Sequence, residues 1–337
     1  MCLGLVYVFF FQKDSVFETG ELEKDAEKLD YEILQGEIFL TLSPLGEEKS
    51  NIYKLDLESM ELEEYFENTP YRNYTSKFSP NLEEMVFVRV YDDDTNQLLI
   101  FNEVTEEIRE LTESSTLFPR NPLFSPDGTK VAYWVYEDSV EPFGFSEKPE
   151  DNAIYTVSLS NNEKSYVTNG AYPLFSPDGK FLLFLKNDGL YTIDLDSEIE
   201  TLVFQLDFAG INDWYEEEGL EPELWTWLTL RFNFCPRNNI LIITDTLGFV
   251  TMVLEVESWS PFVYESLFEV ETHGPNWPVF SPFGNYIVKQ EFGYDDPGMP
   301  QLSFFGFNIE DDYDYYGSVS LDGFLEDFIW ITDWVIR

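Results

Sequence analysis

One phrase occurs twice in the chain, as LFSPDGTKVAYW at residues 123–134 and as LFSPDGKFLLFL at 174–185. In both copies an apolar pair precedes Ser-Pro-Asp-Gly, and a run rich in β-branched, aromatic and other apolar residues follows it. Proline sets φ for the second position of a type I turn, aspartate is tolerated at the third, and glycine supplies the left-handed residue that closes the turn. Because the flanking residues favour strands, the phrase predicts two antiparallel strands joined by a tight turn.

Three variants extend the pattern: FSPNLEEMVFV from Phe78, FCPRNNILIIT from Phe234 and VFSPFGNYIVK from Val279. The proline of the phrase therefore recurs at positions 80, 126, 177, 236 and 282, at intervals of 46 to 59 residues. Two further strand-like runs follow each copy, for example AIYTVSL and KSYVT after the first full phrase. Four strands per repeat at a period in the forties or fifties is typical of propeller blades. The sequence thus predicts an all-β fold.

Five blades can be traced between residues 74 and 320. Upstream, the runs EIFLTLSP, NIYKLDL and ELEEYF match the second, third and fourth strands of a blade without its first. Downstream, DFIWITDWVIR is a lone strand-like run. Joining the two ends completes a sixth blade and removes the open edges that a ring of sheets has to hide. We therefore expect a six-bladed β-propeller of four-stranded antiparallel blades, closed by the N- and C-terminal strands, with seven blades as the alternative.

This pattern assigns residues 37–337 to a single propeller domain and 13–36 to a charged linker or short helix. Residues 1–12 contain an apolar run from Cys2 to Phe11, shorter than the roughly 20 residues that span a bilayer. The run lacks the basic start and small-residue cleavage site of a signal peptide. Two interpretations stay open: the remnant of a membrane anchor, or a strand or helix packed on the body.

The stretch LFSPDGKFLLFLKNDGLYTIDLD at 174–196 resembles the TolB-type propeller repeat, and the resemblance extends over residues 37–336. That family includes periplasmic interaction hubs, surface proteins and the propeller halves of peptidases. The resemblance therefore implies the scaffold and an extracytoplasmic location, periplasmic or at the cell surface. TolB has an α/β domain ahead of its propeller, for which 36 residues do not suffice, so the partners of TolB are not carried over.

The net charge of the chain narrows the classes of partner that we expect it to bind. The chain has 65 acidic and 19 basic side chains, for a net charge of −46. Such a surface repels phosphate backbones and anionic membranes, so we expect no nucleic-acid binding. Cations and basic or amphipathic proteins and peptides are the expected partners, although the acidity is also typical of a surface that serves only solubility.

Catalytic motifs are absent from the sequence. It has one histidine, His273, no G-x-S-x-G elbow, and neither a P-loop nor a dinucleotide fingerprint. Of its two cysteines, Cys235 stands where other copies of the phrase have serine, which predicts a small buried residue. We expect no catalytic residues and no enzyme, with a carboxylate-based, carbohydrate-active enzyme as the alternative.

A binding site is expected on one face of the disc. Connections from first to second and third to fourth strands share one face, and they are short here. Connections from second to third strands and between blades share the other face, and several are long: 91–97, 137–152, 207–224 and 291–301. Long loops on a rigid frame are where binding sites are commonly built. The candidate partner-binding residues there are Asp92, Asp93, Asp94, Phe143, Phe145, Trp214, Tyr215, Glu216, Glu217, Glu218, Tyr294, Asp295 and Asp296.

These side chains predict a non-catalytic recognition scaffold in which aromatic residues anchor a partner and carboxylates steer it. A structural cell-surface protein is a further alternative. The acidic clusters at 92–96, 294–298 and 310–314 also offer oxygen ligands for Ca²⁺, but none has the spacing of an EF-hand loop. We therefore predict no cofactor and keep calcium as the open possibility.

Self-repulsion among the carboxylates generates the first testable prediction. Because salt screens repulsion between exposed charges, the midpoint of thermal unfolding should be appreciably higher in molar NaCl than at low ionic strength. Circular dichroism melts at the two salt concentrations measure the shift. An unchanged midpoint would show that the net charge of −46 does not limit stability.

Overall fold

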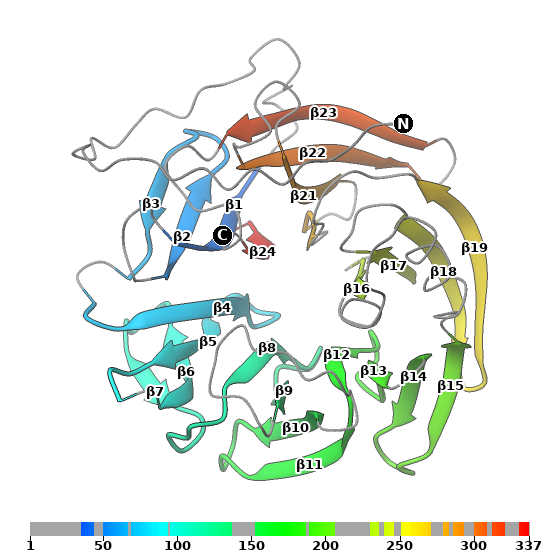
Figure 1. Ribbon diagram of the computed structural model, residues 1–337, viewed down its shortest axis with the longest axis horizontal. Coiled ribbons are helices and arrows are strands. Elements are labelled where there is room, and N and C mark those ends of the chain that lie inside the picture. The colour runs from blue at the N-terminus through cyan, green and yellow to red at the C-terminus, as the bar shows by residue number, and fades with distance from the viewer. Residues whose placement is uncertain are drawn as a thin grey trace, which may run out of the picture.

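The computed structural model places strands of the chain in a ring of sheets around a common centre (Figure 1). It describes residues 35–43, 50–66, 69–93, 95–136, 152–186, 189–205, 230–235, 239–245, 251–270, 279–282, 286–292, 300–308, 312–320 and 330–336. Within these ranges every regular element is a β-strand, and no helix is long and apolar enough to cross a bilayer. The predicted segment 1–12 lies outside the described residues, as does the predicted segment 13–36 apart from Gln35 and Gly36.

The described strands form six four-stranded sheets, numbered here as blades one to six, and strands that are neighbours in a sheet pair antiparallel. Blade one contains β24 (Trp330–Val335), β1 (Glu37–Leu42), β2 (Asn51–Asp56) and β3 (Leu62–Glu64). Blade two contains β4 (Arg72–Phe78), β5 (Glu84–Val90), β6 (Asn96–Asn102) and β7 (Ile108–Glu110). Blade three contains β8 (Pro119–Phe124), β9 (Lys130–Tyr136), β10 (Asn152–Ser158) and β11 (Lys164–Asn169).

The second half of the ring follows the same order. Blade four contains β12 (Ala171–Phe175), β13 (Phe181–Lys186), β14 (Gly189–Asp194) and β15 (Glu200–Gln205). Blade five contains β16 (Leu230–Phe234), β17 (Ile240–Asp245), β18 (Thr251–Trp259) and β19 (Phe262–Val270). Blade six contains β20 (Val279–Phe280), β21 (Tyr286–Phe292), β22 (Pro300–Asn308) and β23 (Asp312–Ser320), the last of them longer than the weak run expected there.

The second strands of blades two to five are buried on both faces over their central residues. In β5, with sequence EMVFVRV, the four residues from Met85 to Val88 are all fully buried. Continuous burial in place of in–out alternation is what packing between two neighbouring sheets requires, because each face of a blade covers the next. The same pattern holds in β13, where Leu182 to Leu185 are buried. This explains why the second strands read as unbroken apolar runs.

The Ser-Pro-Asp-Gly turns form as expected. Gly128 N donates to Ser125 O at 2.8 Å and has a φ of +67°, the left-handed conformation that glycine adopts without a Cβ clash. The Ser125 hydroxyl, in a residue only 4% exposed, donates to Asp127 Oδ1 at 2.6 Å and accepts from Lys130 N at 3.0 Å. These hydrogen bonds explain the serine and the aspartate of the phrase. They also hold the pKa of the Asp127 carboxyl below its usual value.

The third-to-fourth-strand turns lie on the same face. Leu159 N, at the end of β10, donates to Thr129 O in the turn of the same blade at 2.9 Å, and Leu195 N donates likewise to Lys180 O at 2.9 Å. We call this side of the disc the turn face. The opposite side carries the connections from second to third strands and from one blade to the next, and we call it the link face.

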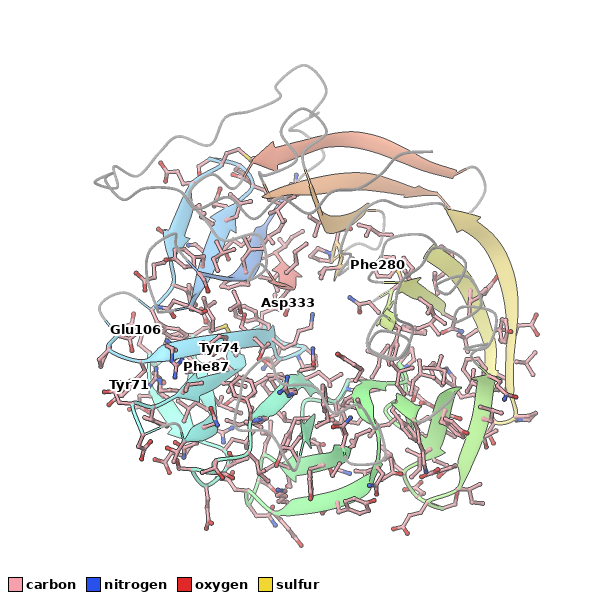
Figure 2. All side chains as sticks on the ribbon, in the orientation of Figure 1. Tyr71, Tyr74, Phe87, Glu106, Phe280 and Asp333 are labelled. Atoms are coloured by element: carbon pink, nitrogen blue, oxygen red, sulfur yellow. The ribbon has the colours of Figure 1, made fainter. Side chains whose placement is uncertain are left out.

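The ends of the described chain close the ring, which confirms the prediction for blade one. β24 pairs with β1 in an antiparallel register that joins Val335 to Glu37 and Trp330 to Thr41. Asp333 then ties β24 to the adjacent blade two: its carboxylate accepts from Lys77 Nζ at 3.1 Å and from Phe78 N at 2.8 Å. Figure 2 shows Asp333 near the middle of the ring, beside the inner strands.

Gly36 generates a test of this closure. Its φ is +99°, and a Cβ there would overlap the carbonyl oxygen of Val335 and lie 2.9 Å from Ile336 Cγ1. Gly36→Ala should therefore force β24 away from β1 and lower the free energy of unfolding by about 2 kcal/mol or more. Urea unfolding followed by tryptophan fluorescence measures the change.

Gly128→Ala is the matched control. Gly128 also has a positive φ, but an added Cβ would meet only Pro80 Cδ, at an ordinary 3.7 Å. Its loss should be limited to the conformational penalty of about 1 kcal/mol. Equal losses in the two variants would contradict a close approach of the chain ends at Gly36.

Candidate functional site

The predicted site residues fall mostly outside the described part of the chain. Asp92 and Asp93 are described, and both are exposed on the link face between β5 and β6. The structure says nothing of the others: Asp94, Phe143, Phe145, Trp214, Tyr215, Glu216, Glu217, Glu218, Tyr294, Asp295 and Asp296. For these residues the link-face site stays a prediction.

The connection that carries Asp92 and Asp93 is shorter than the sequence suggested. β5 ends at Val90 and β6 begins at Asn96, so most of the expected loop at 91–97 is a turn, in which Tyr91 N donates to Thr95 O at 2.9 Å. The Asp93 carboxylate accepts from the Thr95 hydroxyl at 2.6 Å and from Thr95 N at 3.2 Å. These hydrogen bonds lower the pKa of Asp93. The turn therefore holds the ionised Asp93 carboxylate in a fixed place.

Two tyrosines lie next to this turn. The rings of Tyr71 and Tyr91 meet edge to face with centroids 5.0 Å apart, and both residues are half-buried. The Tyr91 hydroxyl donates to Gln97 Oε1 at 2.8 Å, which fixes the ring against β6. Figure 2 shows Tyr71 on the outer side of blade two. Neither tyrosine was among the predicted residues, although each directly precedes a charged residue in the sequence, Arg72 or Asp92.

Arg89 packs against the ring of Tyr71. Its guanidinium carbon lies 5.1 Å from the centroid of the Tyr71 ring and 5.3 Å from that of Phe87. Its Nε donates to Asn73 Oδ1 at 3.0 Å. Burial lowers the pKa of Arg89 from its very high ordinary value, and the guanidinium stays charged at neutral pH. A cation held against the tyrosine face in this way stabilises the ring position.

Hydrogen bonds between buried asparagine side chains next to Arg89 join blades one and two. Asn73, which is fully buried, donates from Nδ2 to Asn51 Oδ1 at 2.9 Å. Asn51 Nδ2 in turn donates to the carboxylate of Glu64 and to Phe66 O at 3.3 Å. Satisfied polar networks of this kind specify a single arrangement of the groups they connect. The link face of blade two is therefore a rigid platform on which the tyrosines and carboxylates have defined places.

The metal ligands, the histidine and the cysteine considered in the sequence analysis can be placed only in part. Across the described ranges, no three His, Cys, Asp or Glu side chains are grouped so as to hold a metal ion. Of the acidic clusters considered for Ca²⁺, 294–298 lies outside those ranges, and 92–96 and 310–314 are described only in part. His273 is also outside them. Cys235 is a free thiol 1% exposed, which confirms its prediction as a small buried residue.

Comparison with known proteins supports the fold. No family model matches the sequence. Among solved structures, TolB from Acinetobacter baumannii superposes with a TM-score of 0.62 at 14% identity, covering 90% of this chain and 67% of TolB. A nidogen/laminin complex gives a TM-score of 0.53 at 10% identity, with 84% of this chain and 93% of the matched chain covered.

An enzyme has the same architecture. Oligogalacturonate lyase from Vibrio parahaemolyticus gives a TM-score of 0.52 at 11% identity, over 82% of this chain and 78% of the lyase. At such low identities the superpositions establish a common fold and leave the function open. The chain therefore has a β-propeller fold like that of TolB, as its repeat predicted.

Proposed function

We propose that the protein is a non-catalytic recognition scaffold that binds a basic or amphipathic protein or peptide on its link face, outside the cytoplasm. The observation that carries this proposal is the platform of blade two. There, the exposed carboxylates of Asp92 and Asp93 flank the packed rings of Tyr71 and Tyr91. Aromatic rings with fixed positions are the usual anchors of protein interfaces, and surrounding carboxylates select cationic partners.

The net charge of the protein also favours a cationic partner. With a net charge of −46, the protein attracts cationic molecules at long range and repels anions. Long-range attraction accelerates encounter, whereas the buried contacts at the tyrosines determine how long a complex lasts. The predicted long loops at 137–152, 207–224 and 291–301 would extend the same surface around the ring, and residues 1–12 would serve as its membrane tether.

One of the solved structures that share this fold supports a protein-binding function. It is a propeller solved in a nidogen/laminin complex, a protein–protein assembly. The lyase neighbour favours the second candidate, a carboxylate-based enzyme that acts on carbohydrate. Such an enzyme would need a deep pocket at the mouth of the ring with two facing carboxyl groups.

Charge-neutral variants of the platform test the proposal. A peptide selected from a random library for binding to the whole protein serves as the probe. Asp92→Asn with Asp93→Asn should lower its association rate several-fold. Tyr71→Ala should raise its dissociation rate, because the anchor is lost. Surface plasmon resonance with the protein immobilised measures both rates.

Glu106→Gln with Glu107→Gln is the matched control. These exposed carboxylates belong to the same blade, but they lie in the β6–β7 turn on the turn face. The double variant removes the same charge from the opposite side of the disc and should leave both rates nearly unchanged. Equal effects of the two double variants would mean that acidity attracts the peptide generically and that the link face is not the site.

A further inference from the structure

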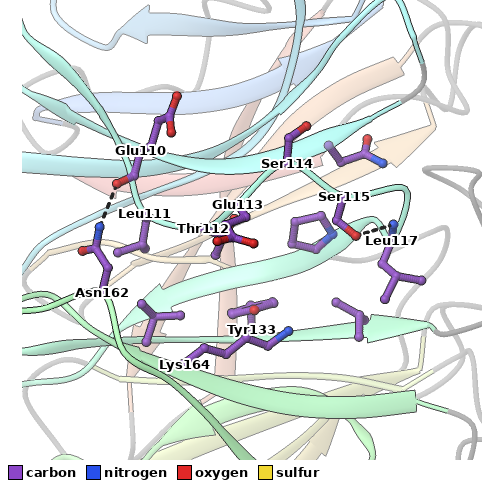
Figure 3. Close-up of a pocket in the computed structure, with 14 residues that line it drawn as sticks. Glu110, Leu111, Thr112, Glu113, Ser114, Ser115, Leu117, Tyr133, Asn162 and Lys164 are labelled. Atoms are coloured by element: carbon purple, nitrogen blue, oxygen red, sulfur yellow. Dashed lines mark hydrogen bonds between the residues drawn. The ribbon is translucent and has the colours of Figure 1, made fainter.

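A pocket of about 640 Å³ lies in the seam between blades two and three (Figure 3). One wall is the segment that leads from β7 to β8, residues 110–117, and the other is formed by side chains of β9, β10 and β11. Small-molecule sites in proteins commonly have volumes of about 300–1,000 Å³. The pocket therefore has the size of a ligand site rather than of a packing defect, which seldom exceeds a water molecule.

Its floor is apolar and comes from both blades. Leu111 of the connecting segment is 2% exposed, and Val135 of β9 and Val157 of β10 are 3% and 0% exposed. The ring of Tyr133 completes the floor and is stacked on Tyr155, with centroids 5.8 Å apart and an angle of 27° between the planes. A ligand must therefore present an apolar surface to this side.

The Tyr133 hydroxyl is a polar group in this apolar setting. Tyr133 is only 3% exposed, and no group in the described part of the chain makes a hydrogen bond to its hydroxyl. Burial raises the pKa of Tyr133 well above its usual value, so the group is a neutral O–H donor and acceptor. The hydroxyl is not one of the enclosed polar atoms without a partner, so it opens into the pocket that Tyr133 lines. A ligand in the pocket can therefore form a hydrogen bond with it.

The rim of the pocket is polar and carries both signs of charge. Glu113 and Ser114, exposed on the connecting segment, have no hydrogen bond or ion pair with the described residues. Lys164 of β11 lies on the opposite wall, with its Nζ 3.7 Å from the centroid of the Tyr155 ring. Figure 3 shows Tyr133 and Lys164 on one side of the pocket and Thr112 and Glu113 on the other. Donors and acceptors thus surround an apolar floor.

The charges of the protein and of the pocket rim restrict the net charge that a ligand can carry. An anion would have to approach a protein of net charge −46 past Glu110 and Glu113, and a cation would meet Lys164 inside the site. A neutral ligand avoids both penalties. It also has to combine an apolar face for the floor with several hydroxyl-type groups for Tyr133, Ser114 and Glu113. Sugar rings combine these properties, because their C–H faces are apolar and their edges carry hydroxyl groups.

We propose that the seam between blades two and three is a binding site for a neutral saccharide unit, with the Tyr133 hydroxyl as a hydrogen-bond contact at the floor. The sugar ring packs its C–H face over Leu111 and Val135 and directs hydroxyl groups to Tyr133, Glu113 and Ser114. This site is separate from the link-face platform, and its occupancy does not depend on the protein-binding function proposed above.

Titration of the full chain with defined sugars tests the site. The neutral probes are maltose, cellobiose, lactose and N,N′-diacetylchitobiose, and digalacturonate is the anionic comparison. Isothermal calorimetry should detect binding of at least one neutral disaccharide and none of digalacturonate. Tyr133→Phe should weaken that binding about fivefold to tenfold, the loss expected for one hydrogen bond. Because no described residue forms a hydrogen bond with the hydroxyl, the unliganded variant should melt at the wild-type temperature or higher.

Tyr166→Phe is the matched control, since Tyr166 lies on β11 outside the pocket and is 56% exposed. It should alter neither sugar binding nor melting. If Tyr133→Phe fails to fold, Ser114→Ala on the exposed rim provides the same test and should also weaken binding. The proposal is overturned if no neutral disaccharide binds, if the variants at Tyr133 and Ser114 bind as the wild type does, or if digalacturonate binds equally well.

Discussion

The pairing of β24 with β1 is the contact on which the rest of the molecule depends. A circle of sheets keeps its edges away from solvent and from other chains only when the last sheet is complete. Here the first strand of blade one comes from the end of the described chain and the other three from its beginning. Asp333 adds a second tie, because its carboxylate holds both a side chain and a backbone amide of β4 in the neighbouring blade. Local packing within blades could persist without this closure, but the relative positions of the blades would not.

A closed ring separates two kinds of surface. On the turn face, the turns that begin at Ser79, Ser125 and Ser176 share one hydrogen-bond pattern. On the link face and in the seams between blades, side chains far apart in the sequence meet. The buried amides of Asn51 and Asn73 show how such a meeting is made rigid, since they link blade one to Arg89 and, through it, to Tyr71. The two binding surfaces that we propose therefore depend on adjacent blades rather than on single repeats.

Much of the scaffold could be predicted from the sequence, because the information is local and repeated. The Ser-Pro-Asp-Gly turn specifies a strand pair through residues in direct succession, and its period specifies the blade. The closure by β24 and the burial of Cys235 followed from the same pattern, since both positions are defined by comparison with other copies.

The two candidate binding sites could be predicted from the sequence far less well than the scaffold. The connection after Val90 was expected to be a long loop, whereas Asp93 and Thr95 hold it as a turn. The placement of Arg89 against Tyr71, and the position of Tyr133 in the pocket at a seam, depend on which side chains face each other across two blades. Periodicity gives the position of a residue within its own blade, but not its neighbour in the next one.

Hydrogen–deuterium exchange of the native full chain, read by mass spectrometry on peptides from β24 and β1, tests the closed ring most directly. If β24 is the first strand of blade one, its amides that bond to β1 should exchange slowly and in the same opening event as those of β1. Rapid exchange of β24 while β1 stays protected would show that the C-terminal strand is not part of the blade, and that the ring is not closed by its two ends.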